Sequence, residues 1–287
     1  MSANAPHPYH RFVAELSRAL TDGAALPLGN LPPRSIPARK AGAPTALILA
    51  PHPDDECIVG ALPLRLLREA GMRVVAAAVT LGSDRSRRQP RQREMEGACR
   101  FLGFEPAVVA SGLERIVPET RAADPAHWQN AVDAVAALIE KSYPQVLFFP
   151  HAADGNKTHM GTHALVQDAL GRQAPSFACV VFETEYWFPM VDPNRLVESR
   201  AEDVADLVAA IGFHAGEVAR NPYHLRLPGW MMDNVRRGAE ILGGQGGTAP
   251  PFEFGTLYRQ SRWAQGRLEP SNEPRLLGAG DSLKTTA

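Results

Sequence analysis

The sequence predicts an α/β protein with a Rossmann-like, doubly wound, mostly parallel sheet and helices on both faces. Short, continuously apolar runs recur along the chain, which is typical of parallel strands covered on both sides. Segments with helical periodicity lie between these runs, and repeated alternation of strand and helix produces a sheet of this kind. The chain has 287 residues, which suffices for one large domain or two small ones.

The N-terminal part of the chain is predicted to lie outside the main domain. Residues 9–20 (YHRFVAELSRAL) have the pattern of a short amphipathic helix, and a segment rich in Pro and Gly follows. Such a segment cannot hold regular structure. We therefore expect an N-terminal helix and Pro-rich arm over residues 1–44, a single domain over 45–267 and a flexible C-terminal tail over 268–287.

The first elements of the main domain predict a βαβ unit. Residues 45–50 (TALILA) form a continuous apolar run, as expected for a buried strand. A helical stretch from about residue 57 to 70 ends at Gly71, and residues 73–80 (RVVAAAVT) have the pattern of a second buried strand. A strand, a helix and a strand in this order predict two neighbouring parallel strands.

The alternation continues and then weakens. A helix is expected to end before Gly103, and the elements after it are a strand, a helix and two more strands, at residues 107–110, 126–141, 145–150 and 178–182. Beyond Pro189 we expect only two helices, at residues 201–210 and about 231–242. The Gly-rich tract GGQGG and the Pro-rich stretch after it have the composition of a loop.

Composition and charge exclude several classes of partner. Thirty basic and thirty-one acidic residues give a formal charge of −1, which supplies no general field for a nucleic acid or an anionic membrane. No stretch reaches the roughly 18 apolar residues of a membrane span, and the start lacks the apolar core of a secretory signal. The three cysteines have no disulfide or zinc-ribbon spacing. We therefore predict a soluble, cytoplasmic protein that acts on a small molecule, and a homo-oligomer stays open.

A dense polar cluster directly follows the first strand. His52, Asp54, Asp55 and Glu56 lie in the turn PHPDDE, and ligands of open α/β sheets bind beyond the carboxyl ends of the strands. Neighbouring carboxylates repel one another unless a cation lies between them. Capping of the next helix is the alternative role for a single aspartate, and it is compatible with metal binding. For the cluster as a whole, the pattern favours a metal site.

A second polar cluster follows the strand at residues 145–150. A catalytic zinc site usually has three protein ligands and one open position, so a third ligand is needed. This cluster supplies His151, Asp154, His159 and His163. His159 and His163 are four residues apart and would share one face of a helix. The residues alone leave open which of these histidines binds the metal.

These motifs resemble a known family. An apolar strand that runs into PHPDDE, with the later segment THMGTHALV, is similar to the PIG-L/LmbE-like zinc-dependent N-acetylglucosaminyl deacetylases. Residues 91–103 also look like the R-x-x-E…A…LG helix of that family. The resemblance covers about residues 45–170.

The resemblance implies an activity and a set of roles. It implies a Rossmann-like fold and hydrolysis of an N-acetyl group, usually on an amino sugar or its conjugate. By the motif match, His52, Asp55 and His159 would bind the metal and Asp54 would be the general base. Zinc is the implied cofactor, and Fe²⁺ or another divalent metal also suits two histidines and one aspartate.

The chain departs from the family pattern at one position. The family commonly has H-x-x-H at the second cluster, and the register that makes His159 the ligand puts Asn156 at the first histidine. Asn156 can donate a neutral hydrogen bond to an oxyanion but supplies neither charge nor proton. The general acid is therefore open, with His151 and His163 as substitutes. We assign Arg91, His151 and His163 as candidate substrate-binding residues.

Other aromatic residues and other functions are also considered. Tyr186, Trp187, Trp230 and Tyr258 could stack on a sugar, although such residues more often pack in a core or lid. Two alternatives to a sugar deacetylase are an amidase for a non-sugar amide and a catalytically silent binding protein. A nucleotide-binding module is disfavoured, because PHPDDE replaces the Gly-rich turn and its carboxylates would repel a pyrophosphate.

Overall fold

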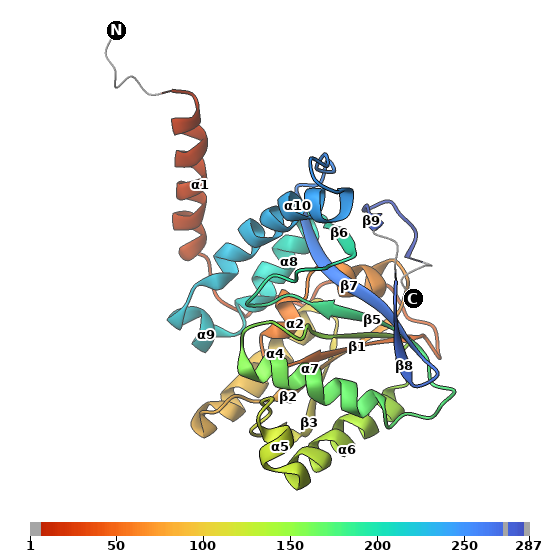
Figure 1. Cartoon of the computed structure of the whole chain (residues 1–287). Coiled ribbons are helices and arrows are strands. Elements are labelled where there is room, and N and C mark those ends of the chain that lie inside the picture. The colour runs from red at the N-terminus through yellow and green to blue at the C-terminus, as the bar shows by residue number, and fades with distance from the viewer. Residues whose placement is uncertain (1–6, 272–274, 284–287) are drawn as a thin grey trace.

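The computed structural model describes residues 7–271 and 275–283 (Figure 1). Its strands form one sheet in the order β3-β2-β1-β4-β5-β7-β6-β9, and β8 pairs with β7. The strands are β1 (Thr45–Ala50), β2 (Arg73–Thr80), β3 (Glu105–Leu113), β4 (Val146–Pro150), β5 (Cys179–Thr184), β6 (Arg195–Ser199), β7 (Phe254–Ala264), β8 (Arg267–Pro270) and β9 (Arg275–Leu277).

Helices connect these strands. They are α1 (Tyr9–Ala24), α2 (Asp55–Ile58), α3 (Leu62–Arg68), α4 (Arg88–Leu102), α5 (Thr120–Ala123), α6 (Pro125–Ser142), α7 (Lys157–Leu170), α8 (Ala201–Ile211), α9 (Ala215–Arg220) and α10 (Leu227–Gly243), with 3₁₀ turns η1 (Arg85–Arg87) and η2 (Tyr223–Arg226). The helices predicted from the periodicity are present, with ends that differ by a few residues, except that the stretch predicted over residues 57–70 is divided into α2 and α3.

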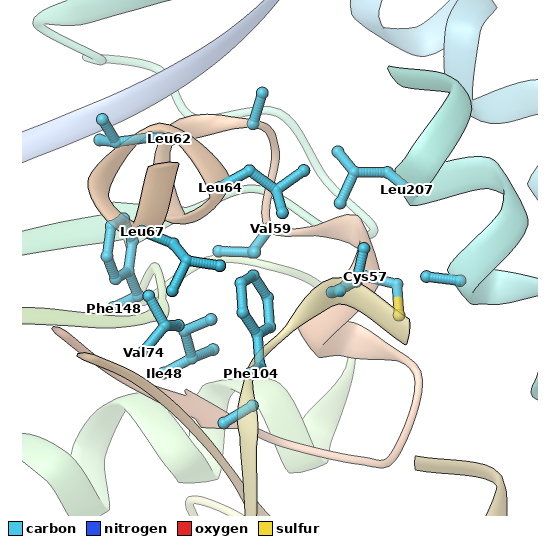
Figure 2. Close-up of a cluster of buried hydrophobic side chains, with 14 of the residues drawn as sticks. Ile48, Cys57, Val59, Leu62, Leu64, Leu67, Val74, Phe104, Phe148 and Leu207 are labelled. Carbon is cyan, nitrogen blue, oxygen red and sulfur yellow. The ribbon is translucent and has the colours of Figure 1, made fainter. Parts of the chain in front are cut away.

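The first five strands confirm the predicted fold class. β3, β2, β1, β4 and β5 are parallel neighbours, and β1 lies at the point where the strand order reverses. Every residue of β1 and β4 is buried, because helices cover both faces of the sheet. Figure 2 shows part of one core, where Ile48 of β1, Val74 of β2 and Leu64 of α3 lie in the same cluster. The carboxyl ends of β1 and β4 therefore meet beside the reversal point, which is the usual ligand site in such sheets.

The last third of the chain contains strands that the sequence did not predict. β7 is antiparallel to both β5 and β6, and Leu257 and Tyr258 within it are fully buried. The expectation of a flexible tail from residue 268 is wrong for its described part, because β9 pairs with β6 and Leu277 is buried. β7 mixes arginine and amide side chains with apolar ones, so its sequence lacks the continuous apolar run of β1.

One predicted helix is in fact two. The stretch from residue 57 to 70 is broken into α2 and α3 at Gly60, which has a φ of +90°. A Cβ at Gly60 would collide with the side chains of Tyr258 and Thr256 in β7. The break lets the segment turn closely over the sheet, and only glycine permits that backbone and that approach.

The N-terminal helix α1 stands apart from the sheet (Figure 1). None of its residues is buried, and Tyr9, Phe12 and Val13 are more than half exposed. Among the described residues, no helix combines the length and apolar character that crossing a membrane requires.

Candidate metal centre and active site

The turn after β1 holds its polar side chains in a constrained backbone. Asp54 has a φ of +116°, a conformation that non-glycine residues rarely adopt and that is often found at functional sites. The backbone N–H of His52 donates to Asp55 Oδ2 at 2.9 Å, and the N–H of Asp54 donates to Glu56 Oε2 at 2.8 Å. The turn is thus held by the carboxylates of its own motif, and α2 begins at Asp55.

His52, Asp55 and His159 bring three ligand atoms together. His52 Nδ1 lies 3.4 Å from Asp55 Oδ2, and His159 Nε2 lies 3.3 Å from each of these two atoms. Zinc with ligands at 2.0–2.1 Å in a tetrahedron has neighbouring ligand atoms about 3.3 Å apart. The three atoms therefore fit one face of a tetrahedral site, with the fourth position open for a small molecule.

Two oxygen-bearing side chains fix His159. Asn156 is the N-cap of α7, and its Oδ1 accepts from the backbone N–H of Thr158 at 2.9 Å and of His159 at 3.4 Å. His159 Nδ1 lies 3.4 Å from Oδ1 of the fully buried Asp154. A carboxylate behind a ligating histidine fixes the ring and increases its basicity.

Asp154 also joins two loops of the site. Its carboxylate accepts from the backbone N–H of Tyr186 at 3.0 Å and of Trp187 at 3.1 Å, both in the segment after β5. The Tyr186 ring meets the His159 ring edge-on, with centroids 5.1 Å apart. Asp154 therefore joins the loops after β4 and β5 beside the His159 ring.

Charges around the triad shift its pKa values in a direction that suits a cation. Burial opposes ionisation of Asp55, but His159 and His52 outweigh it and lower the pKa of Asp55. Burial likewise lowers the pKa of His159, but the carboxylates of Asp55 and Asp154 outweigh it and raise that pKa. Both shifts have the same cause: positive charge between these side chains is stabilised, as that of a bound cation would be.

Asp54 lies beside the triad in a different environment. Burial and the nearby Asp55 carboxylate raise the pKa of Asp54 from 3.8 to about 7. Its Oδ2 accepts a 2.7 Å hydrogen bond from the Tyr223 hydroxyl, and Arg91 Nη2 lies 3.7 Å from its Oδ1. A carboxyl group that titrates near neutral pH can accept and return a proton.

These residues border one cavity of about 480 Å³. Three carboxylates and three arginines line it together with apolar and aromatic side chains, and its lining residues are His52, Asp54, Asp55, Ile58, Arg91, Asn156, His159, Tyr186, Trp187, Glu217, Arg220, Asn221, Tyr223, Arg226, Leu227 and Trp230. The predicted residues Arg91 and Asn156 are among them.

Two predicted substrate-binding residues lie elsewhere. His151 and His163 are not among the lining residues; their rings bond to backbone, His151 to Phe188 O at 2.9 Å and His163 to Pro150 O at 3.0 Å. Burial lowers the pKa of His163. The lining of the cavity therefore does not support their assignment to the substrate, since the His163 ring bonds to Pro150 O at the end of β4.

A buried ion pair behind the site joins Glu56 of the motif to His214, a residue that the sequence did not single out. Glu56 Oε1 lies 2.8 Å from His214 Nε2, and both residues are fully buried. Burial lowers the pKa of His214, but Glu56 outweighs it and the net shift is upward. Cys57 lies next to this pair, with Sγ 4.0 Å from His214 Nε2. The 2.8 Å distance is that of a direct hydrogen bond, so this group has no space for an ion between its ligand atoms.

The fold and the site define an α/β protein with a candidate three-ligand metal centre. Residues 47–170 match the family model described as PIG-L, GlcNAc-PI de-N-acetylase. This match confirms the resemblance seen in the sequence.

Known proteins similar to this chain include both deacetylases and another kind of enzyme. The 1D-myo-inositol 2-acetamido-2-deoxy-alpha-D-glucopyranoside deacetylase of Thermobifida fusca (strain YX) is 25% identical over 197 residues, which cover 58% of this chain and 67% of that protein. The solved N,N'-diacetylchitobiose deacetylase from Pyrococcus horikoshii has a TM-score of 0.56 and 15% identity, over 90% of this chain and 94% of that one.

The 4-carboxy-2-hydroxymuconate hydratase of Pseudomonas putida KT2440 has a TM-score of 0.58 and 16% identity, over 76% of this chain and 95% of that one. At these identities the two structures show a shared fold. Because one of them is a hydratase, the shared fold does not by itself define the reaction of this chain.

Proposed function

We propose that this chain is a metal-dependent deacetylase that hydrolyses the N-acetyl group of an amino sugar or an amino-sugar conjugate. The observation that carries the proposal is the triangle of ligand atoms from His52, Asp55 and His159, beside the carboxylate of Asp54, in a region that matches the PIG-L family model. The relatives named as deacetylases of acetylated sugars support the substrate class.

The cavity wall suits a sugar. Trp187 and Trp230 line it from the loop after β5 and from α10, and aromatic faces bind the apolar faces of sugar rings. The volume of about 480 Å³ lies within the usual range for small-molecule sites. Arg91, Arg220 and Glu217 supply hydrogen-bonding groups for sugar hydroxyls.

The chemistry divides among the side chains at the ligand triangle. A bound zinc ion would activate water and polarise the amide carbonyl. Asp54 takes the proton of the attacking water, since its pKa of about 7 allows proton uptake at neutral pH. Asn156 uses Oδ1 for the α7 cap, and its amide N–H groups, which donate to no described residue, can donate to the carbonyl oxygen as negative charge develops.

Asp54 also supplies the proton that the leaving amine needs. The histidines lining the cavity are the two proposed ligands, His52 and His159, so neither is free to act as an acid. Asp54 holds a proton after the water attacks, and returning it to the amine nitrogen completes hydrolysis. This assignment replaces His151 and His163 as proton donors, because neither of them lines the cavity.

Two measurements test the proposal. The first is elemental analysis of protein purified without a histidine tag, beside the ligand variant His159→Gln and the control His163→Gln one helical turn away. We expect about one zinc per wild-type chain, loss of zinc in His159→Gln and retention in His163→Gln. Zinc retained in His159→Gln, or a wild type that binds no divalent metal, would refute the site.

The second measurement is acetate release from N-acetylglucosamine, diacetylchitobiose and non-sugar N-acetyl amides. Acetate released preferentially from the sugars supports the proposal. Release from the non-sugar amides alone would identify an amidase of another class. A zinc-loaded protein that releases acetate from none of the compounds would contradict the deacetylase function while leaving the metal site intact.

A further inference from the structure

A segment outside the matched PIG-L domain closes the active site. The matched residues end at 170, whereas η2 and the helices beside it lie between residues 215 and 243. Glu217, Arg220, Tyr223, Arg226 and Trp230 from this segment all line the cavity. The family match therefore does not cover this wall of the cavity, and its role depends on which residues of the matched domain it contacts.

One of these contacts reaches the proposed general base directly. The Tyr223 hydroxyl donates to Asp54 Oδ2 at 2.7 Å, whereas Asp54 Oδ1 has no hydrogen bond to a described residue and has Arg91 at 3.7 Å. The terminal torsion of an aspartate is broad, so an unanchored carboxylate would rotate. The hydrogen bond from Tyr223 to Oδ2 holds the carboxylate in one orientation and leaves Oδ1 to contact the substrate.

The segment that carries Tyr223 is itself anchored to the PIG-L domain. His214 directly precedes α9 and pairs with Glu56 at 2.8 Å. The backbone N–H of Gly216 donates to Glu94 at 3.2 Å, and Glu217 lies 3.8 Å from Arg91. Glu94 and Arg91 both belong to α4. The segment that carries Tyr223 therefore contacts the matched domain at Glu56 and at two residues of α4.

Glu56, which pairs with His214, also bonds to the backbone of Asp54. Glu56 Oε1 pairs with His214, and its Oε2 accepts the Asp54 N–H at 2.8 Å. Both the main chain and the carboxylate of Asp54 are therefore connected to the segment from residue 214 to 223. A base held at both ends in this way is preorganised.

We propose that Tyr223 is a positioning residue for catalysis: its hydroxyl holds the Asp54 carboxylate so that Oδ1 faces the reacting water and the leaving amine. The inference rests on the proposed hydrolase function, in which Asp54 is the proton carrier. Tyr223 acts through Asp54, so its removal should affect turnover more than substrate binding or metal binding.

The test compares Tyr223→Phe with Tyr258→Phe. Both substitutions remove only a hydroxyl that donates at 2.7 Å, but the Tyr258 hydroxyl bonds to Val59 O inside the core. We expect Tyr223→Phe to keep one zinc per chain and a KM within about twofold of wild type, and to lower kcat roughly ten- to a hundredfold, part of what a general base contributes. Tyr258→Phe should lower the melting temperature and leave kcat unchanged.

A second comparison asks whether the effect passes through Asp54. In an Asp54→Asn background, Tyr223→Phe should lower the residual kcat less than twofold, because residues that act as a unit are not additive. The inference is overturned by wild-type kcat in Tyr223→Phe, by a raised KM with unchanged kcat, or by full additivity with Asp54→Asn.

A structural readout separates this inference from the proposed function. Crystal structures of zinc-loaded wild type and Tyr223→Phe should show the Asp54 carboxylate in one orientation in the wild type and rotated or spread over two in the variant. An unchanged carboxylate in the variant would overturn the inference. If the wild type releases no acetate, the deacetylase function fails, and the carboxylate orientation still decides whether Tyr223 orients Asp54.

Discussion

Replacing Asp54 by asparagine should stabilise the metal-free protein while removing most of its activity. The folded protein raises the pKa of Asp54 from 3.8 to about 7, mainly through burial. Its folded state therefore binds the proton more tightly than the unfolded chain does. This contribution to stability is fully present below pH 3.8 and is lost as the pH rises through about 7. Asparagine is neutral at every pH and avoids that loss.

The size of the effect follows from the shift. At 1.36 kcal/mol per pH unit, the shift corresponds to about 4 kcal/mol at pH 8 as an upper limit. The side chain of Asp54 is 15% exposed, so water screens part of this cost. The asparagine oxygen can still accept from Tyr223, so that hydrogen bond is kept. We therefore expect Asp54→Asn to be more stable than wild type by about 2–4 kcal/mol at pH 8.

Urea denaturation of both proteins in the presence of a chelator measures this difference. The advantage of Asp54→Asn should shrink between pH 8 and pH 5, where the wild-type carboxyl group is protonated. Zinc at pH 8 should also reduce it, because a cation stabilises the ionised carboxylate. Equal or lower stability of the variant at pH 8, or an advantage that does not change with pH, would refute the reasoning.

Three further predictions concern the support of the site. Asp154→Asn should weaken zinc binding about 10- to 100-fold in a competition titration, since the carboxylate behind His159 is lost; unchanged affinity would contradict that role. Zinc affinity should be lower at pH 6 than at pH 8, because Asp55 and Asp154 outweigh burial and raise the pKa of His159, which must lose its proton to bind. Calorimetry in several buffers should detect the release of this proton, and binding without proton release would contradict the prediction. Gly60→Ala should lower the free energy of unfolding by about 2–4 kcal/mol in chemical denaturation. Gly71 is also at positive φ but has open space around it, so Gly71→Ala should lower it by only about 1 kcal/mol. Equal losses would show that the collision with β7 is unimportant.

Much of the ligand site could be predicted from local sequence. The turn after residues 45–50 and the cluster after residues 145–150 each follow a continuously apolar strand. Because β1 and β4 are parallel neighbours, their carboxyl ends lie at the same edge, and His52 and His159 come within 3.3 Å of each other. Strand pattern and the edge rule suffice to expect this meeting.

The choice among the histidines after β4 depended on the start of α7. Asn156 caps the helix, and this sets the rotation of every side chain that follows. His159 consequently reaches the triad, while His163 faces Pro150 O. Residue types alone left these alternatives open, because a shift of one residue in the helix start would rotate both rings by about 100°.

The sequence by itself determined the parallel half of the sheet, the two polar clusters and the resemblance to the family whose model residues 47–170 match. These features are local, since each depends on a run of apolar residues or on a short motif beside it. Only the tertiary structure decided that β7 enters the sheet between β5 and β6 and that Tyr223 bonds to Asp54. Asp54 and Tyr223 are 169 positions apart, and nothing in the residues around either one indicates a partner at that separation. Such contacts are set by how whole elements pack, so they appear only once the chain has folded.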